Sequence, residues 1–418
     1  MEPADFSQNP NPTTRLDQLN SYLDAFESRV VSHEDRGDGR WVALAESAFY
    51  PTSGGQLHDT GTLNDVAVTE VVKRQESVWH RLERPALETG QCVSGMIDWE
   101  RRYRHMQRHS GQHLLSQALL RVNPAFETHS VSLSGPPCTI DFAGDPVAED
   151  LEQVETLVNR AAYQNLAITA FEVDEGELSG FSLRRPPKVS GRIRLVNMGD
   201  WELTACGGTH LRASAEALPL KTLRFERIRG GLTRLYFLAG LEALEDYQLK
   251  HRVGYQLAVS FSAKVAELPE RISTLRQQLS EAKQEAGTWV TKLVHVVATE
   301  LIHKATPIPG GRLVTHVLPE ADTGLLKELA QTLQAYDSTV ALLATRGDDR
   351  IRFLFTRSAD IDLDMNALLQ GVLPAVSGKG GGRPELAQGS GVKPAGLERA
   401  LALAQNHLLG LVGKADQA

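Results

Sequence analysis

The chain has little cysteine: only Cys92, Cys138 and Cys206 occur in 418 residues, and they lie far apart. Three thiols cannot form a closed set of disulfides, so we expect all three to be reduced. No uninterrupted apolar run reaches the roughly 18 residues that a membrane span needs. Residues 1–5 (MEPAD) carry neither the basic nor the apolar segment of a secretory signal. These absences predict a cytoplasmic protein with no membrane association.

The composition is that of an ordinary globular protein, with 41% hydrophobic and 23% charged residues. This balance excludes a chain that is disordered throughout. A chain of 418 residues also exceeds what one hydrophobic core usually holds, so several domains are expected.

The net charge of −8 argues against general attraction to nucleic acids, but the charge is unevenly distributed. Residues 181–240 carry a net charge of +7, whereas the rest of the chain carries −15. The basic residues of this segment are Arg184, Arg185, Lys188, Arg192, Arg194, Arg212, Lys221, Arg224, Arg227, Arg229 and Arg234. A solvated surface is one explanation of such a segment, and a bound polyanion is the other.

The patterns along the chain predict an α+β multidomain protein. Residues 1–95 contain short β-rich runs between Gly, Asp and Asn turns, which predicts a small β-barrel-like domain. Residues 96–240 alternate helix and strand patterns and form the second, α+β domain. Its first helix is expected over residues 98–122, with Asp98 as the N-cap.

A helical segment is expected over residues 241–305. From Val265 to Leu293, apolar residues recur at alternating steps of three and four, which is the a/d pattern of a coiled coil. Pro269 suits the first turn of that helix. The apolar seam packs either on its own domain or on a partner helix, in a hairpin or in a second subunit. The last alternative would make the protein a homodimer.

Residues 306–418 alternate strand and helix patterns and are expected to form a C-terminal α/β domain. We expect residues 378–384 (GKGGGRP) to be a loop in this domain. Its glycine spacing does not match a nucleotide P-loop. Backbone N–H groups, together with Lys379 and Arg383, could instead hold a phosphate, although a tight turn would give the same pattern.

Two short motifs carry the residue types of a metal site. His109 and His113 lie four residues apart, on one face of the expected helix, and Cys206 and His210 flank a glycine turn. Three imidazole nitrogens and one thiolate match the ligand preference of Zn²⁺. His105 pairs with His109 at the same spacing, but we expect it to be an ordinary helix histidine.

A third motif, FYPTSGGQ at residues 49–56, is by itself a glycine turn between strands. In order along the chain, however, three segments resemble the editing domain of alanyl-tRNA synthetase and its free-standing relatives, the AlaX proteins: FYPTSGGQ, DWERRYRHMQRHSGQHLL (98–115) and GDWELTACGGTHL (199–211). Residues 378–391 (GKGGGRPELAQGSG) resemble the C-terminal domain that alanyl-tRNA synthetases share with some DHH-family phosphoesterases. The resemblance runs from about residue 22 to near the C-terminus and fits the long AlaX type.

The resemblance implies a trans-editing hydrolase that cleaves the ester of mischarged tRNA(Ala), chiefly Ser-tRNA(Ala) and also Gly-tRNA(Ala). It assigns Zn²⁺ to His109, His113, Cys206 and His210. Gln56 would line the amino-acid pocket, and Ser47 stands where many relatives have threonine. Ser47 and Gln56 are the candidate catalytic residues, as hydrogen-bond partners of the serine hydroxyl in that pocket. The C-terminal domain would bind the tRNA body. Phosphate contacts are then expected from Lys379 and Arg383. The helix arginines Arg101, Arg102, Arg104 and Arg108 could add to them, although a solvated helix face would explain these four equally well.

Several alternatives stay open at this level. The zinc could keep one open coordination position, or all four ligands could close it. Ser110 stands where the metalloprotease motif HExxH needs glutamate, so that chemistry is excluded. A non-catalytic tRNA-binding protein with a structural zinc would bind tRNA in a salt-dependent way without hydrolysis. A phosphoesterase is disfavoured because the chain contains no Asp-His-His triplet.

Overall fold

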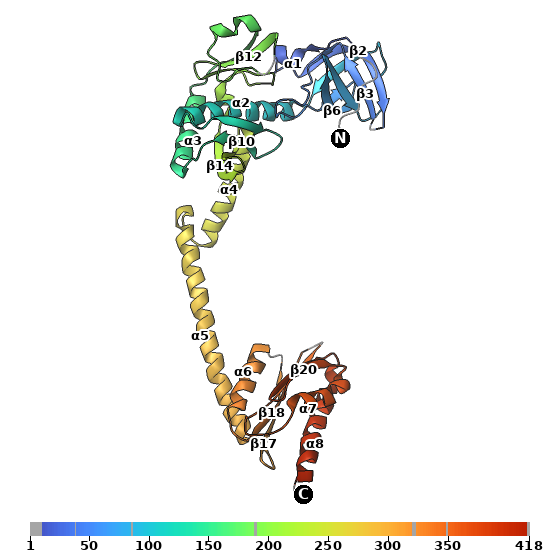
Figure 1. Ribbon diagram of the computed structural model, residues 1–418, viewed down its shortest axis with the longest axis vertical. Helices are drawn as coiled ribbons and strands as arrows, with labels where there is room; N and C mark the ends of the chain where they lie inside the picture. The colour runs from blue at the N-terminus through green and yellow to red at the C-terminus, as the bar shows by residue number, and fades with distance from the viewer. Residues whose placement is uncertain are drawn as a thin grey trace. The chain divides into compact units, whose positions relative to one another are not determined.

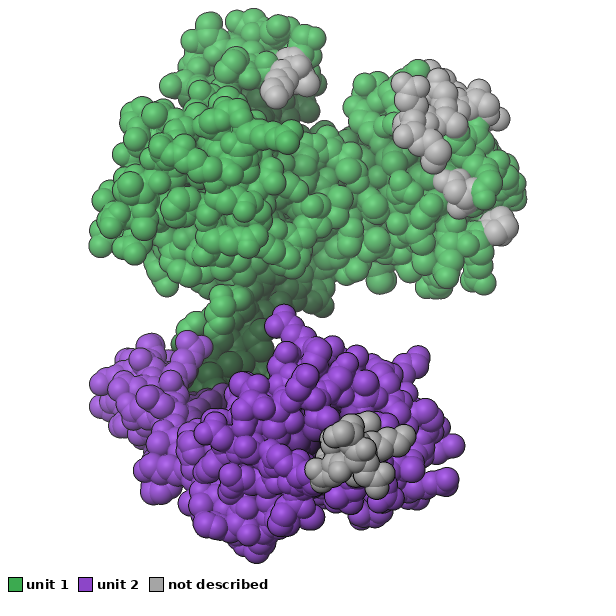
Figure 2. Space-filling model, turned by 60° about the horizontal axis from the view of Figure 1, so that its bottom comes forward, with its two compact units in different colours: residues 1–257 green, residues 258–418 purple. Residues whose placement is uncertain are grey.

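The protein is a mixed α+β multidomain chain, as the sequence predicts, and forms two compact units, residues 1–257 and residues 258–418 (Figure 2). The computed structural model describes residues 11–37, 39–84, 87–187, 190–319, 323–347 and 350–415. Lys188, one of the basic residues noted above, lies outside these ranges. None of the helices within these ranges combines the length and the apolar composition that a membrane-spanning segment requires.

Six strands of the first unit close into a barrel in the order β2-β3-β7-β6-β5-β8, and every neighbouring pair is antiparallel. Val30, Leu44 and Val78 are completely buried, because one face of each strand points into the barrel. The strands are β2 (Ala25–Arg36), β3 (Gly39–Leu44), β5 (Gly61–Leu63), β6 (Val66–Arg74), β7 (Ser77–Leu82) and β8 (Cys92–Ile97).

A short N-terminal segment packs beside the barrel. Strand β1 (Thr14–Arg15) pairs in parallel with β4 (Glu46–Ser47), and α1 (Leu16–Leu19) follows β1 directly. This pairing places residues 14–19 next to the strand that carries Ser47.

Helix α2 (Trp99–Val122) follows the last barrel strand and begins at the expected N-cap, since the Asp98 side chain accepts a hydrogen bond from the Arg101 N–H at 3.2 Å. Figure 1 shows α2 between two sheets. One has the order β14-β15-β10-β9 and the other β11-β12-β13. Their strands are β9 (Thr128–Ser132), β10 (Cys138–Ala143), β14 (Leu220–Ile228) and β15 (Leu232–Ala239), and β11 (Ile168–Asp174), β12 (Arg192–Met198) and β13 (Glu202–Ala205).

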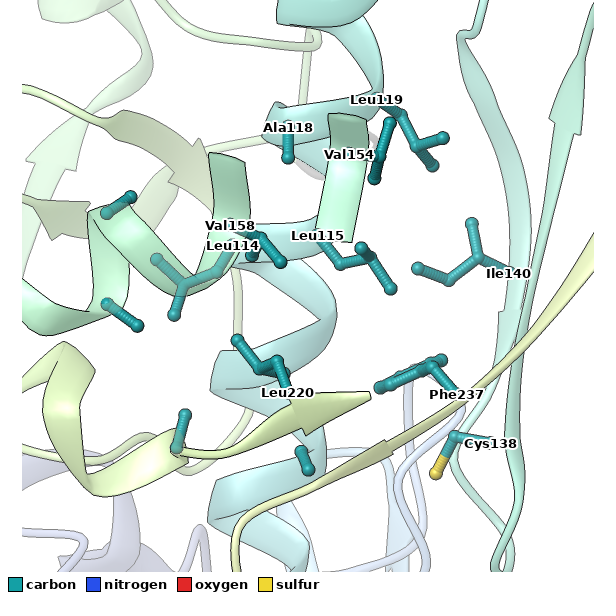
Figure 3. Close-up of a cluster of buried hydrophobic side chains, with 14 of the residues drawn as sticks. Leu114, Leu115, Ala118, Leu119, Cys138, Ile140, Val154, Val158, Leu220 and Phe237 are labelled. Atoms are coloured by element: carbon teal, nitrogen blue, oxygen red, sulfur yellow. The ribbon is translucent and has the colours of Figure 1, made fainter. Parts of the chain in front are cut away.

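The apolar face of α2 forms the core of this region with the four-stranded sheet and with α3 (Ala148–Tyr163). Leu115 and Leu119 lie close to Ile140 of β10 and Val154 of α3, as Figure 3 shows. Helix α4 (Leu241–Ser260) begins directly after β15. A buried ion pair between Arg108 and Glu242 ties α2 to the first turn of α4.

The second unit contains α5 (Leu268–His303) and a six-stranded sheet in the order β16-β17-β18-β19-β21-β20. The sheet is antiparallel except for the β17–β18 pair, which α6 connects. The strands are β16 (Thr306–Ile308), β17 (Gly311–Pro319), β18 (Thr339–Arg346), β19 (Ile351–Arg357), β20 (Lys379–Arg383) and β21 (Leu386–Gly391). The other helices are α6 (Thr323–Gln334), α7 (Met365–Val372) and α8 (Leu397–Ala415).

Both faces of this sheet are covered by helices. Ala341 and Leu343 of β18 pack on α6 and on the C-terminal part of α5, whereas Val340 and Leu342 pack on α7 and α8. Because successive side chains of a strand point to opposite faces, this apolar run serves two cores at once.

The glycine-rich run at residues 378–384 is not the loop that the sequence suggested. Residues 379–383 form β20, an edge strand that pairs with β21 in a hairpin. Gly380 and Gly382 lie so close to the backbone of β21 that a Cβ at either position would overlap it. The glycines are therefore required by close strand packing, a reason that local sequence does not reveal.

Helix α5 carries the apolar seam that the sequence predicted. Leu268 is buried at the start of the helix, with Pro269 in its first turn. Leu275, Leu279 and Trp289 along the seam are each more than half exposed.

Candidate metal site

His109 and His113 project from the middle of α2 toward Cys206 and His210, which lie in the turn that follows β13. One ligand atom from each of the four side chains lies within 4.8 Å of all the others. The Cys206 Sγ is 3.4 Å from the Nε2 of His109 and 3.3 Å from the Nε2 of His210. Tetrahedral zinc with bonds of about 2.0–2.3 Å separates its ligand atoms by roughly 3.3–3.7 Å, and both of these sulfur–nitrogen distances lie in that range.

Each of the three histidines uses its Nδ1 atom on a partner outside the cluster. The Nδ1 of His109 lies 2.8 Å from the Oε1 of Gln56, and the Nδ1 of His113 lies 2.9 Å from the Oε2 of Glu202. The Nδ1 of His210 lies 3.2 Å from the Ser110 hydroxyl. The Gln56 and Glu202 oxygens can only accept, so they place the proton of His109 and His113 on Nδ1 and leave the Nε2 lone pair for a metal. The Ser110 hydroxyl can accept from the Nδ1 of His210 in the same way. The Nε2 atom of each of the three histidines is therefore the one that can bind a metal ion in the cluster.

The electrostatics of the cluster also favour a metal ligand set. Burial by itself raises the pKa of the Cys206 thiol, but His109 and His210 lower it well below its ordinary value. Burial lowers the pKa of His210 to about 3, which keeps that imidazole neutral. Burial also opposes protonation of His113, but the negative charge of Glu202 raises the pKa of His113 to about 9.

The turn at residues 206–209 lies close to α2, and side chains from other elements hold its backbone carbonyl oxygens. A side chain at Gly208 would overlap the ring of His109, so only glycine lets the turn approach the helix this closely. The Arg194 Nη1 donates to the carbonyl oxygens of Cys206 and Gly208, at 2.9 and 3.0 Å. Gln18 donates to the carbonyl of Gly207 at 3.3 Å.

A cavity of about 130 Å³ lies beside His210. It is enclosed by the N-terminal segment, by the β11–β12 strands and by the residues that follow the glycine turn; its lining includes Gln18, Asn20, Ser21, Tyr22, Thr169, Arg194, His210 and Arg212. The Arg212 guanidinium stacks 3.9 Å from the centroid of the Tyr22 ring. The lining is therefore mostly polar, with two guanidinium groups next to the cluster.

Of the two residues expected in the amino-acid pocket, Gln56 touches the cluster and Ser47 does not. Gln56 is buried, and its Nε2 donates to the Thr209 hydroxyl at 2.8 Å while its Oε1 faces His109. The Ser47 hydroxyl is completely buried, 2.8 Å from the Nε2 of His80, and accepts the Phe49 N–H at 3.1 Å. Among the hydrogen bonds of the described residues, none joins Ser47 to the four ligands.

The arginines expected to contact phosphate are placed very differently. Arg101 is partly exposed and donates from Nε to the His58 carbonyl at 3.0 Å. Arg102 has no exposed surface, and its Nε lies 3.0 Å from both carboxylate oxygens of Asp59. The expectation that Arg102 contacts phosphate does not hold here, because its guanidinium is enclosed and paired. The sequence motif does not distinguish Arg101 from Arg102, because the buried partner of Arg102, Asp59, lies 43 residues away along the chain.

Lys379 and Arg383 are both exposed on β20. Because they lie four residues apart on one strand, they share a face. In the basic segment at residues 181–240, by contrast, most side chains are engaged by acidic partners or by aromatic rings. Ion pairs join Arg184 to Glu202, Arg185 to Glu127, Arg192 to Glu172, Lys221 to Glu155, Arg227 to Asp145 and Arg234 to Asp141.

Two residues near the cluster were not singled out from the sequence. Glu202 is buried behind His113, and Arg194 braces the glycine turn. The available signal for Glu202 was a carboxylate four residues before Cys206, in the segment that leads to the glycine turn. Arg194 gave no local signal, because its partners are backbone carbonyls on another element.

The fold and the cluster define a protein of α+β class with a buried site that could hold a metal ion. Three family models match parts of the chain: tRNA synthetases class II (A) at residues 21–101, the threonyl and alanyl tRNA synthetase second additional domain at residues 193–236, and the DHHA1 domain at residues 310–408. The second of these contains Cys206 and His210.

Relatives with similar sequences are alanine–tRNA ligases. The enzyme of Pyrococcus abyssi is 31% identical over 395 residues, covering 90% of this chain and 42% of the relative. That of Thermococcus kodakarensis is 32% identical over 407 residues, covering 93% of this chain and 43% of the relative. A solved structure, the C-Ala domain of Aquifex aeolicus alanyl-tRNA synthetase, aligns with 25% of this chain and 96% of that chain, at 29% identity and a TM-score of 0.24.

The chain is therefore an alanyl-tRNA synthetase-related, AlaX-like protein. It spans less than half the length of the alanine–tRNA ligases that it matches. The similarity includes both the region of the metal cluster and the C-terminal unit.

Proposed function

We propose that this protein hydrolyses the ester bond of mischarged tRNA(Ala), chiefly Ser-tRNA(Ala) and also Gly-tRNA(Ala), and that it acts in the cytoplasm in trans on tRNA charged by another enzyme. The observation that carries the proposal is the buried cluster of three histidines and one cysteine, built on segments similar to the synthetase second additional domain. The similarity to alanine–tRNA ligases supports tRNA(Ala) as the substrate.

The proposal includes Zn²⁺ at His109, His113, Cys206 and His210. The donor set fits this ion, because three imidazole nitrogens and one cysteine sulfur lie within 4.8 Å of one another, and each imidazole is oriented by a further partner. Zinc bound here would supply Lewis-acid polarisation if a coordination position opens, and would otherwise fix the four side chains in place.

Side chains near the cluster can supply the hydrogen bonds that ester hydrolysis needs. An aminoacyl ester is already activated, so that orienting a water and stabilising the developing oxyanion contribute most of what hydrolysis needs. Gln56 uses one of its two amide hydrogens on Thr209, and in the described hydrogen bonds the Thr209 hydroxyl accepts without donating. The second Gln56 N–H and the Thr209 O–H are thus the donors that we assign to the substrate.

Ser47 enters this proposal as a positioning residue. Its hydroxyl holds His80 and the Phe49 N–H at the start of residues 48–56, the loop that ends at Gln56. A fixed loop keeps the Gln56 amide in place beside His109. The small polar cavity next to His210 would take the amino-acid side chain. A pocket that must hydrogen-bond the serine hydroxyl leaves polar groups unpaired with alanine, and can discriminate by factors of about 10⁴.

The C-terminal unit would hold the tRNA body. Lys379 and Arg383 are exposed on one face of the edge strand β20. A cavity of about 540 Å³ adjoins Arg383 and also includes Lys327, so a third cation faces the same region. We assign the phosphate contacts to this surface, with Arg101 adding to them near the metal site.

The proposal also includes a homodimer through α5. The exposed residues of its seam repeat with the three-and-four spacing of a coiled coil. A second copy of the chain presents the same seam, so that an isologous pairing would cover Leu275, Leu279 and Trp289.

One observation favours a second candidate function. The cluster offers four protein ligands, enough to satisfy zinc completely, and closed sites of this kind are usually structural. The alternative is therefore a tRNA-binding protein without hydrolytic activity.

Deacylation of Ser-tRNA(Ala), measured beside Gly-tRNA(Ala) and Ala-tRNA(Ala), tests the proposal and separates the two candidates. We expect release of serine from tRNA charged beforehand, with much slower loss of alanine and no requirement for ATP. Binding of tRNA without release of serine would select the structural alternative. Equal loss of serine and alanine would contradict the proposed specificity.

A further inference from the structure

The carboxylate of Glu202 lies directly behind His113, on the side away from the other three ligands. Its Oε2 is 2.9 Å from the Nδ1 of His113, and its Oε1 is held by the Nε of Arg184. Each carboxylate oxygen therefore serves a different partner, and the three side chains form a line that leads from the cluster to Arg184.

We propose that Glu202, oriented by Arg184, is a positioning residue that fixes the tautomer and the ring orientation of His113 and so sets the affinity of the site for its metal. The inference rests on the proposed metal site and adds residues that the four-ligand motif does not contain.

Burial gives the first argument for this role. The Glu202 side chain has no exposed surface, and the Arg184 side chain is only 9% exposed. Enclosing an ion pair costs more free energy than packing apolar residues of similar size, so the pair is a weak source of stability. A carboxylate at this position has a clear use, however, because it accepts the Nδ1–H of His113 and leaves the Nε2 lone pair toward Cys206.

The fit of Arg184 gives the second argument. Its Nη1 atom is buried and has no hydrogen-bond partner among the described residues, while its Nε contacts Glu202. A guanidinium that only stabilised the local fold would be expected to satisfy its buried donors. The contact with Glu202 therefore determines how this side chain is placed.

The register of β13 gives the third argument. Glu202 and Thr204 are both buried, whereas Leu203 between them is partly exposed. Because alternate side chains share a face, Cys206 directly after the strand continues the face of Glu202 and Thr204. Strand β13 and the residue that follows it therefore place two residues beside α2: the metal ligand Cys206, and Glu202, which orients the ligand His113.

A cavity makes the role of Arg184 testable. It has a volume of about 350 Å³, and Arg184 and Glu202 both line it, together with Arg121 and Trp201. Removing the Arg184 side chain would leave space for a small guanidinium ion to enter from this cavity and pair with Glu202. Chemical rescue by methylguanidinium is therefore expected for Arg184→Ala.

The experiment measures the cobalt and zinc affinity of the full-length chain, by competition with a chromophoric chelator and by the visible absorption of bound Co²⁺. We expect Glu202→Ala to weaken metal binding by about 10–100-fold, which is the usual effect of removing a carboxylate partner of a ligating histidine. Glu202→Gln keeps the shape and an acceptor oxygen but loses the charge, so we expect a smaller loss and an altered Co²⁺ spectrum. Arg184→Ala should lose affinity and recover part of it with millimolar methylguanidinium.

The matched control is Glu172→Gln, since Glu172 pairs with Arg192 in the same three-stranded sheet and both side chains are exposed. It should bind metal as the wild type does. If the wild type binds metal and Glu202→Gln and Arg184→Ala bind it equally well with unchanged spectra, the inference is wrong while the metal site stands. If the wild type itself binds neither ion, the metal site of the proposed function fails, and this inference fails with it. Should Glu202→Ala not fold, the Gln variant and the rescue decide the question alone.

Discussion

The Nδ1 of His109 lies 2.8 Å from the Oε1 of Gln56, although the two residues are 53 positions apart. This contact joins the loop after β4 to the helix that carries two of the four ligands. The same glutamine donates to the hydroxyl of Thr209, which directly precedes His210 in the turn that also carries Cys206. Gln56 therefore links the two halves of the cluster.

Replacing Gln56 should affect the metal site, whereas replacing Ser47 should affect the fold. Gln56→Ala removes the partner of His109, and we expect metal affinity to fall by about 10-fold or more, with a parallel loss of deacylation. Ser47→Ala leaves the buried His80 nitrogen without its partner and loosens the loop that ends at Gln56. We therefore expect a loss of about 1–3 kcal/mol of unfolding free energy, with a smaller loss of metal affinity than in Gln56→Ala. Chelator competition and urea unfolding measure the two effects. Equal metal loss in both variants would contradict the distinction.

The stability of the chain should depend on pH through His80. Burial lowers the pKa of His80 to about 4, whereas the unfolded chain has an ordinary histidine there. Between about pH 6.5 and pH 4 the unfolded state binds the proton more readily, so the free energy of unfolding should fall with falling pH by up to about 3 kcal/mol from this group. Urea unfolding of His80→Gln should show a shallower pH dependence than the wild type.

His129→Gln serves as the control for that measurement, because His129 is exposed. It should leave the pH dependence as it is in the wild type. A pH dependence that is identical in His80→Gln and in the wild type would show that His80 does not titrate between the folded and unfolded states.

The edge strand β20 should contribute to tRNA binding by charge. We expect Lys379→Ala and Arg383→Ala each to weaken binding of tRNA and to reduce the slope of log affinity against log salt by about 1. Arg346→Ala is the control, since Arg346 is an exposed arginine of the same unit that pairs with Glu398. Fluorescence anisotropy at several salt concentrations measures the slopes. A slope that stays constant in both β20 variants would remove this strand from the interface.

The exposed seam of α5 should hold two chains together. Light scattering on the wild type should report twice the mass of one chain, and Leu279→Glu should shift the protein toward monomer because it places a charge in the apolar contact. Gln284→Glu adds a charge to the same helix outside the seam and should leave the mass unchanged. A monomeric wild type would refute the proposed dimer.

Local patterns predicted several elements well, and long-range contacts explain most of the differences. Helix α2 and its Asp98 cap follow from apolar spacing and from a capping residue, both of which are local. The burial of Arg102 against Asp59 could not be predicted, since the partner lies 43 residues away. The same reason applies to Glu202, whose partners His113 and Arg184 come from separate elements.

The candidate site divides in the same way. The residue types and spacings of His109, His113, Cys206 and His210 were visible in the sequence, and the structure brings their ligand atoms together. The partners that orient the three histidines could not be predicted from the sequence, because each Nδ1 partner lies far from its histidine along the chain. Gln56 was expected to line the amino-acid pocket, and its hydrogen bond to His109 emerges only from the folded chain.

X-ray absorption at the zinc edge of the purified full-length protein tests most directly whether these four side chains hold one metal ion. We predict one zinc per chain, with three nitrogen scatterers at about 2.0–2.1 Å and one sulfur at about 2.3 Å. Cys206→Ala should lose the sulfur and most of the zinc, whereas Cys138→Ala, which replaces a buried cysteine outside the cluster, should keep both. A zinc environment without sulfur, or full zinc content in Cys206→Ala, would contradict the account.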